Sequence, residues 1–162
     1  MDRLGLEYLD LYLIRWPQPA LNKFVDTFKA FAYLRDQGRI GSIGVSNFEP
    51  EHLTVLVDAT GIVPAVNQTE LHPRFPQTEL REVHARLGIA TEAWAPLGQG
   101  ALLTDPTVTA VAEARGRTTA RALIRWRIQL GNIVIPKSVN PRADCEQFRL
   151  GPDPRTFNFT GR

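Results

Sequence analysis

The sequence has very little cysteine and lacks a long apolar run. Among its 162 residues Cys145 is the single cysteine, which excludes an internal disulfide framework and favours a reducing compartment. No apolar run approaches the roughly 20 residues that cross a bilayer, and the opening Met1-Asp2-Arg3 is not typical of a signal peptide. These absences predict a cytoplasmic protein without a membrane partner.

An excess of charge of one sign is also lacking. The 19 Lys and Arg residues nearly balance the 17 Asp and Glu residues, for a net charge of +2, and the cations are spread along the whole chain. Nucleic-acid binding shows as a basic cluster, so no nucleic-acid partner is expected. With 43% apolar and 22% charged residues, the composition is typical of a globular domain with its own core.

Short β-rich runs alternate with longer helical patterns, and no linker divides them. This alternation is typical of parallel strands joined by helical crossovers. The first strand, at 8–14, is apolar on both faces and is therefore expected to be buried. Further strands are predicted at 40–46, 64–68, 89–94 and 133–136. Helices are predicted at 21–37, 50–59, 78–87, 106–115, 118–130 and 142–148.

Two architectures use this α/β pattern, an open doubly wound sheet and a closed (β/α)8 TIM barrel. The doubly wound sheet predicts a glycine-rich loop between an early strand and its helix, but Gly41-Ser42-Ile43-Gly44 lies within a strand. The barrel predicts polar residues at the carboxyl ends of the strands. Such residues follow every predicted strand: Arg15-Trp16, Ser46-Asn47, Gln68 with Glu70, Trp94, and Lys137-Ser138. The sequence therefore favours a partial barrel of five strands.

Several strings of the sequence resemble the aldo-keto reductases, in that family's order and spacing. They are Leu11-Tyr12-Leu13-Ile14-Arg15-Trp16-Pro17, Ile43-Gly44-Val45-Ser46-Asn47-Phe48, Pro64-Ala65-Val66-Asn67-Gln68, Glu70-Leu71-His72-Pro73 and Ile135-Pro136-Lys137-Ser138. A further string is most similar to the bacterial branch of the 2,5-diketo-D-gluconate reductases, Trp94-Ala95-Pro96-Leu97-Gly98-Gln99-Gly100. The resemblance makes residues 1–148 the C-terminal part of one barrel domain, strands four to eight, and leaves 149–162 as a divergent, irregular tail.

The resemblance implies an oxidoreductase that reduces aldehydes or ketones to alcohols by hydride transfer from NADPH, with NADH less favoured. Ser46 and Asn47 match the residues that hold the nicotinamide carboxamide in the family, and Gln68 matches a third contact. A carboxamide is fixed in one orientation by groups that both donate and accept hydrogen bonds. Two alternatives stay open: Ser46-Asn47 as a cap for the helix near Pro50, and Gln68 as a buried amide.

Further residues match the family's contacts with the rest of the cofactor. Trp94 occupies the place of a ring stacked on the nicotinamide, with a core tryptophan as the alternative. Lys137 matches a residue that binds the 2′-phosphate in the family, and Arg142 lies one position before the family's arginine for that phosphate. The alternative is that both are solvated surface charges. The full set implied for cofactor binding is Ser46, Asn47, Gln68, Trp94, Pro96, Leu97, Gly98, Lys137, Ser138, Arg142 and Glu146.

The catalytic group of the family consists of Asp, Tyr, Lys and His, and the first three have no counterpart here. The position of the His is taken by Arg15, beside Trp16 as the expected substrate-binding residue. Arginine stays charged at every working pH, yet it could polarise a carbonyl oxygen or hold an acidic substrate. The alternative is a residue that drifted after catalysis was lost.

The leading hypothesis is therefore an NADPH-dependent carbonyl reductase in truncated form, acting on a small carbonyl substrate. Upstream sequence or another chain would have to complete the barrel. The rival hypotheses are a non-catalytic cofactor-binding or interaction fragment and a non-functional remnant with unpaired strand edges. A metal site is not predicted, because His52, His72 and His84 have no further ligands at suitable spacing.

Overall fold

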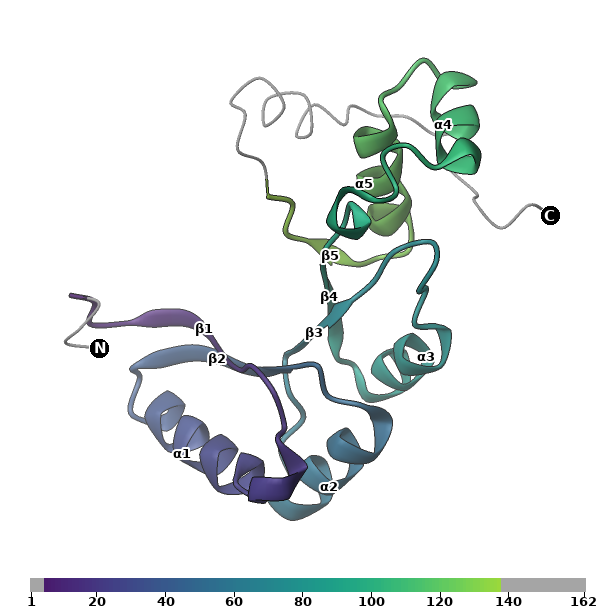
Figure 1. The fold of residues 1–162 in the computed structure, drawn as a ribbon. Helices are drawn as coiled ribbons and strands as arrows, with labels where there is room; N and C mark the ends of the chain where they lie inside the picture. The colour runs from purple at the N-terminus through teal and green to yellow at the C-terminus, as the bar shows by residue number, and fades with distance from the viewer. Residues whose placement is uncertain (1–4, 138–162) are drawn as a thin grey trace. The chain divides into compact units, whose positions relative to one another are not determined.

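The computed structural model describes residues 5–137, and residues 1–4 and 138–162 lie outside the described part. The helix expected at 142–148 and the tail at 149–162 fall outside it. Along the described residues five strands alternate with helices (Figure 1). The strands form one sheet in the order β1-β2-β3-β4-β5, which is also their order along the chain.

The elements follow the predicted pattern closely. The strands are β1 (Leu9–Ile14), β2 (Ile40–Ser46), β3 (Val66–Glu70), β4 (Ala90–Trp94) and β5 (Ile133–Val134). The helices are η2 (Pro19–Leu21), α1 (Phe24–Asp36), α2 (Pro50–Thr60), α3 (Thr78–Leu87), η3 (Gly98–Gly100), α4 (Pro106–Glu113) and α5 (Thr119–Gln129). The largest shift is at α1, which begins three residues after the predicted start because Asn22 has a left-handed backbone, with φ 45°.

The strands pair in parallel, as the registers of β1 with β2 and of β2 with β3 show. Leu9 pairs with Ile40 at one end of β1, and Ser46 of β2 pairs with Gln68 of β3. Strands β4 and β5 are also parallel. A doubly wound sheet reverses its strand order at a switch point, whereas this sheet keeps the order of the chain. The strand order therefore favours the barrel.

Strand β1 is more exposed than its sequence predicted. Leu11 is 37% exposed and Tyr12 is 41% exposed, although the run is apolar on both faces. The reason is that β1 is an edge strand of the described sheet, with β2 as its neighbour on one side. A run that is apolar on both faces is fully buried only where both faces are covered.

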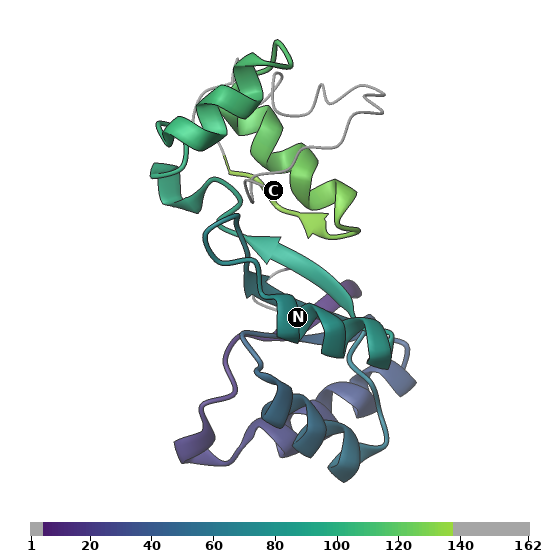
Figure 2. The same ribbon diagram turned by 90° about the vertical axis from the view of Figure 1, so that its right-hand side faces the viewer.

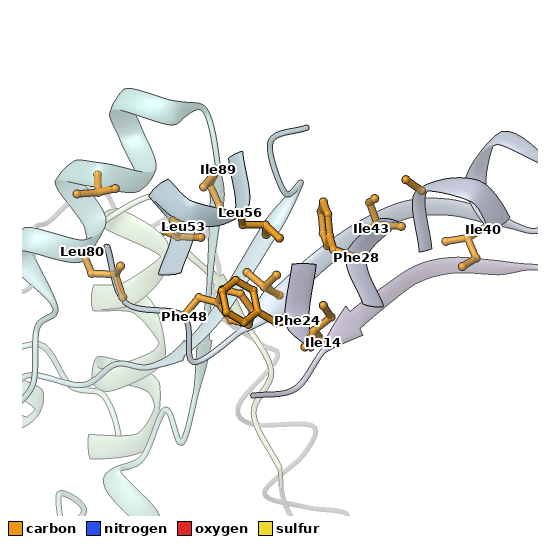
Figure 3. Packing of buried hydrophobic residues seen from close by; sticks show 13 residues of the cluster. Ile14, Phe24, Phe28, Ile40, Ile43, Phe48, Leu53, Leu56, Leu80 and Ile89 are labelled. Atoms are coloured by element: carbon orange, nitrogen blue, oxygen red, sulfur yellow. The ribbon is translucent and has the colours of Figure 1, made fainter. Parts of the chain in front are cut away.

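The described residues group into two compact units. The first comprises residues 5–69 and 78–91, and the second comprises 70–77 and 92–137. In the first unit α1 and α2 lie along the strands β1 and β2 (Figure 1). Phe24 and Phe48 meet edge to face in the core of this unit, with ring centroids 5.5 Å apart (Figure 3). Aliphatic side chains such as Leu53 and Leu56 complete this fully buried cluster.

The second unit has its own small core. Helices α4 and α5 lie side by side (Figure 2). Leu102, Val108 and Leu123 form one buried cluster between them and the loop after β4. A second cluster is centred on Leu71 and Trp126. Each unit therefore positions its own strand ends by packing.

We expect Gly44→Ala to lower the free energy of unfolding by about 1–3 kcal/mol, the usual range for overpacking. An added Cβ at Gly44 would lie 2.7 Å from the Val66 carbonyl oxygen and 2.7 Å from Leu13 Cδ2. Urea unfolding followed by tryptophan fluorescence measures the loss. Gly41→Ala is the control in the same strand: its closest neighbour is the movable Tyr8 hydroxyl, with a backbone oxygen at 3.0 Å. Equal losses in both variants would contradict the expectation.

Candidate functional site

The three residues predicted to hold the nicotinamide carboxamide lie on the neighbouring strands β2 and β3 and the residue that follows β2. Ser46 is the last residue of β2 and pairs in register with Gln68, the middle residue of β3. The backbone N–H of Asn47 donates to the Gln68 carbonyl oxygen at 2.8 Å. The Asn47 side-chain amide donates to Ser46 Oγ at 3.1 Å. The structure therefore places a residue with a hydroxyl and two residues with primary amides next to one another in the sheet.

Asn47 also connects this cluster to the end of β1. Its Nδ2 lies 3.1 Å from the backbone carbonyl oxygen of Arg15, to which it donates. Asn47 has a left-handed backbone, with φ 60°, a conformation that asparagine adopts more readily than most residues. Asn47 thus bonds the end of β1 through its side chain and Gln68 of β3 through its backbone N–H.

The cap of helix α2 is formed by other residues than the sequence suggested. Glu49 is the N-cap, and His52 Nδ1 accepts a hydrogen bond from its backbone N–H at 3.1 Å. Ser46 and Asn47 lie ahead of this cap. Helix capping, the alternative role for this pair, therefore belongs to Glu49 and His52.

A cavity of about 320 Å³ opens between the end of β1 and the start of α1, within the first unit. This volume lies at the lower end of the range for small-ligand pockets. Its charged lining residues are the cations Arg15 and Lys23, and the ring of Trp16 is 52% exposed beside them. The lining residues are Ile14, Arg15, Trp16, Pro17, Gln18, Leu21, Lys23, Phe24 and Thr27. This cavity is cationic and partly aromatic.

The predicted residues of the second unit lie at the end of β4 and in the turn that follows. Trp94 is the half-buried last residue of the strand. Pro96 is buried, and Leu97 packs against the cluster of the second unit that contains Leu102. Gly98 has a positive φ of 56°, and an added Cβ there would lie 2.8 Å from Leu102. Packing against Leu102 therefore fixes the course of this turn.

The residues expected at the 2′-phosphate fall almost wholly outside the described part. Lys137 is exposed and is the last described residue. Ser138, Arg142 and Glu146 lie beyond it, as does Cys145. One cation of the expected phosphate site is therefore placed, after the end of β5.

A buried polar network in the first unit was missed by sequence reasoning. His84 is 1% exposed; its Nε2 lies 2.9 Å from Asn67 Nδ2 and its Nδ1 lies 2.8 Å from Thr91 Oγ1. Burial lowers the pKa of His84 to about 4, and the nearby Arg81 acts in the same direction, so the ring is neutral at pH 7. The signal in the sequence was a histidine on the apolar face of helix α3.

Arg127 in the second unit was also missed. It is fully buried, where its Nε donates to the Leu71 carbonyl oxygen at 2.8 Å and its Nη1 donates to the Leu123 carbonyl oxygen at 2.7 Å. Burial lowers its pKa to about 9, which leaves it charged at neutral pH. His72 lies 3.4 Å from Glu70, and its pKa is lowered mainly by burial. These contacts support a structural role for the Glu70–Pro73 segment.

The described residues contain neither a membrane-spanning helix nor a cluster of metal ligands. No helix between residues 5 and 137 is long and apolar enough to cross a membrane. Within the same residues no group of three or more His, Cys, Asp or Glu side chains is arranged to hold a metal ion.

The model of the Aldo/keto reductase family matches residues 1–143. The chain belongs to this family. An aldo-keto reductase of Mycolicibacterium smegmatis is 66% identical over 183 residues, which cover 99% of this chain and 66% of the relative. An aldo-keto reductase of Mycolicibacterium paratuberculosis is 48% identical over 160 residues, covering 99% of this chain and 54% of the relative. The chain thus spans about half to two-thirds of the length of these relatives.

Several solved structures have the same fold as this chain. Gox0644 in its apo form is 51% identical, with a TM-score of 0.91, over 94% of this chain and 56% of that structure. A mutant of Gox0644 in complex with NADPH is 52% identical, with a TM-score of 0.89, over 92% of this chain and 55% of that structure. The aldo/keto reductase of Brucella melitensis is 48% identical, with a TM-score of 0.89, over 97% of this chain and 59% of that structure. The predicted family and the α/β fold of a partial barrel are confirmed.

Acidification should destabilise the chain through His84. In the unfolded chain His84 has a pKa near 6.5, above its folded value of about 4, so the unfolded state binds the proton first. Stability is greatest above pH 6.5 and falls toward pH 4. We expect a loss of about 2 kcal/mol from this group between pH 7 and pH 5.

Urea unfolding at the two pH values measures the loss, with His84→Gln as the variant that cannot titrate at this position. The difference in pH dependence between the two proteins isolates the contribution of His84 from that of other groups. An identical pH dependence in both would show that His84 does not titrate with a lowered pKa.

Proposed function

We propose that this chain binds NADPH through Ser46, Asn47 and Gln68, as part of a reductase that converts aldehydes or ketones to alcohols. The observation that carries this proposal is that Ser46 and Asn47 at the end of β2 lie beside Gln68 on β3, in strand register and joined by a backbone hydrogen bond. The NADPH complex of the Gox0644 mutant supports it, as does a Bombyx mori aldo-keto reductase solved in complex with NADP, 33% identical with a TM-score of 0.85.

The chemistry of the three side chains suits a nicotinamide carboxamide. That group offers two N–H donors and one acceptor oxygen, and Ser46, Asn47 and Gln68 together supply both donors and acceptors. When bound, the reduced cofactor supplies the hydride. The role of these residues is to orient the nicotinamide ring so that one face is presented to the substrate.

The residues of the second unit, taken by themselves, suit parts of a nicotinamide cofactor. Trp94 offers a partly exposed π-face at the end of β4, which suits a nicotinamide ring. The turn with Pro96, Leu97 and Gly98 suits the pyrophosphate. Lys137 supplies a cation for the 2′-phosphate, which NADPH has and NADH lacks. We therefore propose a preference for NADPH.

The cavity beside Arg15 suits the carbonyl substrate. Within the described part of the chain, the Arg15 guanidinium has no hydrogen-bond or ion-pair partner, so it can act on a ligand. A guanidinium polarises a carbonyl oxygen and binds a carboxylate through two parallel hydrogen bonds. Trp16 and Phe24 supply apolar walls. We propose that Arg15 favours carbonyl compounds that also have a carboxylate.

A second candidate function is binding of the cofactor without catalysis. It is favoured by Arg15 itself, because arginine stands where the family has a neutral histidine. The two candidates differ in turnover and agree on cofactor binding. Loss of NADPH absorbance with small aldehydes distinguishes them, since the reductase consumes NADPH and the binding fragment does not.

The purified 162-residue chain should bind NADP⁺ and, more weakly, NAD⁺. We expect Gln68→Leu to weaken NADP⁺ binding by about tenfold, because one charge-free hydrogen bond to the carboxamide is worth about 1 kcal/mol and an unpaired amide costs more. Quenching of tryptophan fluorescence on titration measures the affinity.

Gln37→Leu is the matched control, an amide at the far end of helix α1 outside the candidate site. It should leave the affinity for NADP⁺ unchanged. If the wild-type chain fails to quench with either cofactor while it unfolds cooperatively in urea, the proposed cofactor site is wrong.

Arg15→Met should weaken the binding of 4-carboxybenzaldehyde by about tenfold and leave that of benzaldehyde within about twofold. The reason is that the guanidinium contacts the carboxylate, while the apolar walls contact the ring. Ligand-observed NMR on the chain saturated with NADP⁺ measures both affinities. Lys29→Met, an exposed cation of α1 outside the cavity, should change neither. Equal weakening of both aldehydes by Arg15→Met would exclude a carboxylate contact.

A further inference from the structure

One buried amide holds the backbone that follows the Ser46–Asn47 pair. Asn67 Nδ2 donates to the Phe48 carbonyl oxygen at 2.8 Å, and the Phe48 backbone N–H donates to Asn67 Oδ1 at 3.4 Å. Asn67 is fully buried, so these bonds form away from water, where an unmade bond is costly. A single side chain on β3 thus satisfies both backbone groups of the residue next to Asn47.

The orientation of this amide is set by Phe48, and His84 completes its hydrogen bonding. The two hydrogens of Asn67 Nδ2 go to the Phe48 carbonyl oxygen and to His84 Nε2, 2.9 Å away. His84 Nε2 must therefore be an acceptor, so the proton of the neutral ring is on Nδ1, which donates to Thr91 Oγ1 at 2.8 Å. A flipped amide would point its Nδ2 at the Phe48 N–H, two donors facing each other. Only one arrangement satisfies every partner.

Phe48 is fixed on its other side by packing. Its ring is fully buried and lies edge to face with Phe24 (Figure 3). The centroid of the His52 ring lies 5.9 Å from that of Phe48. With the ring anchored and the backbone held by Asn67, Phe48 has little freedom. We refer to Asn67, His84 and Thr91 together as the Asn67 clamp.

The clamp affects Asn47 because Asn47 directly precedes Phe48 and has an unusual backbone conformation. Asn47 is left-handed, a conformation that costs about 1–2 kcal/mol for a residue with a Cβ and persists only where neighbours enforce it. The enforcing contacts are its own N–H bond to Gln68 and the clamp on the next residue. Release of Phe48 would let the backbone leave this conformation and would turn the Asn47 and Ser46 side chains.

We propose that the Asn67 clamp positions Ser46 and Asn47 for the nicotinamide carboxamide, and so sets affinity for the nicotinamide end of the cofactor alone. This inference rests on the proposed cofactor function. In this proposal His84 and Thr91 contact neither cofactor nor substrate. They are positioning residues that act through Asn67 and Phe48.

The test compares NADP⁺ with adenosine 2′,5′-bisphosphate, which keeps the adenosine and 2′-phosphate and lacks the nicotinamide. His84→Leu removes the acceptor for the second Nδ2 hydrogen of Asn67 and leaves that donor buried without a partner, and we expect it to weaken NADP⁺ binding by about tenfold and bisphosphate binding by less than about twofold. His84→Gln keeps an acceptor oxygen and should restore NADP⁺ affinity to within about threefold of wild type. Isothermal titration calorimetry measures both ligands.

Leu56→Ala is the control for general destabilisation. Leu56 is fully buried in the same core and is not part of the clamp. It should lower stability and leave the ratio of the two affinities unchanged. If Leu56→Ala shifts the ratio as His84→Leu does, or if His84→Leu weakens both ligands equally, the positioning role is overturned.

Hydrogen exchange of the ligand-free chain separates this inference from the proposed function. Amides of Asn47 and Phe48 should exchange at least about tenfold faster in His84→Leu than in wild type, and His84→Gln should restore protection. Unchanged exchange at these two amides overturns the clamp whatever the ligands do. If wild type binds neither ligand, the cofactor function fails, the positioning role fails with it, and exchange still decides whether the clamp itself exists.

Discussion

The parallel register of β1, β2 and β3 is the constraint on which the candidate site depends. Val45 is opposite Ile14, and Ser46 is opposite Gln68, so the polar residues that follow the strands arrive at the same edge. Side chains alternate between faces along a strand, and a slip of one residue would turn each set to the opposite face. The buried side chains Ile43 and Val45 hold this register, so the core of the first unit and the position of its polar strand ends are set together.

The sequence predicted most of the fold because its signals are local. Gly38 and Gly88 follow helices where a positive φ is needed, and Pro50 and Pro106 open helices at N1. It was wrong about the burial of β1, since burial depends on which neighbours a strand has. It also missed the Asn67 clamp, whose bonds join residues 7, 17 and 19 positions apart on separate elements. Periodicity shows that a position faces inward and leaves its hydrogen-bond partner unknown.

Two arginines show why environment decides the role of a charged side chain. Arg127 is fully buried, and its Nε and Nη1 donate to two backbone carbonyl oxygens, so it braces the segment at Leu71. Arg15 is exposed at a cavity in which the other charged lining residue is Lys23. A guanidinium in water keeps its donors for a ligand, whereas one enclosed by protein must use them internally. Both arginines look alike in the sequence, and only burial separates a structural cation from one that can bind an anion.

The link between Asn47 and Arg15 runs through backbone, and this separates cofactor binding from chemistry. Asn47 Nδ2 contacts the carbonyl oxygen of Arg15 and makes no use of its side chain. Any residue at position 15 that keeps the strand would therefore preserve the hydrogen bonds around Ser46, Asn47 and Gln68. In the proposed site, a guanidinium in place of the family's imidazole would change the charge beside the substrate and would leave the support for the proposed nicotinamide contacts as it is. Such an arrangement allows a change of substrate preference, or loss of catalysis, without loss of the cofactor-binding geometry.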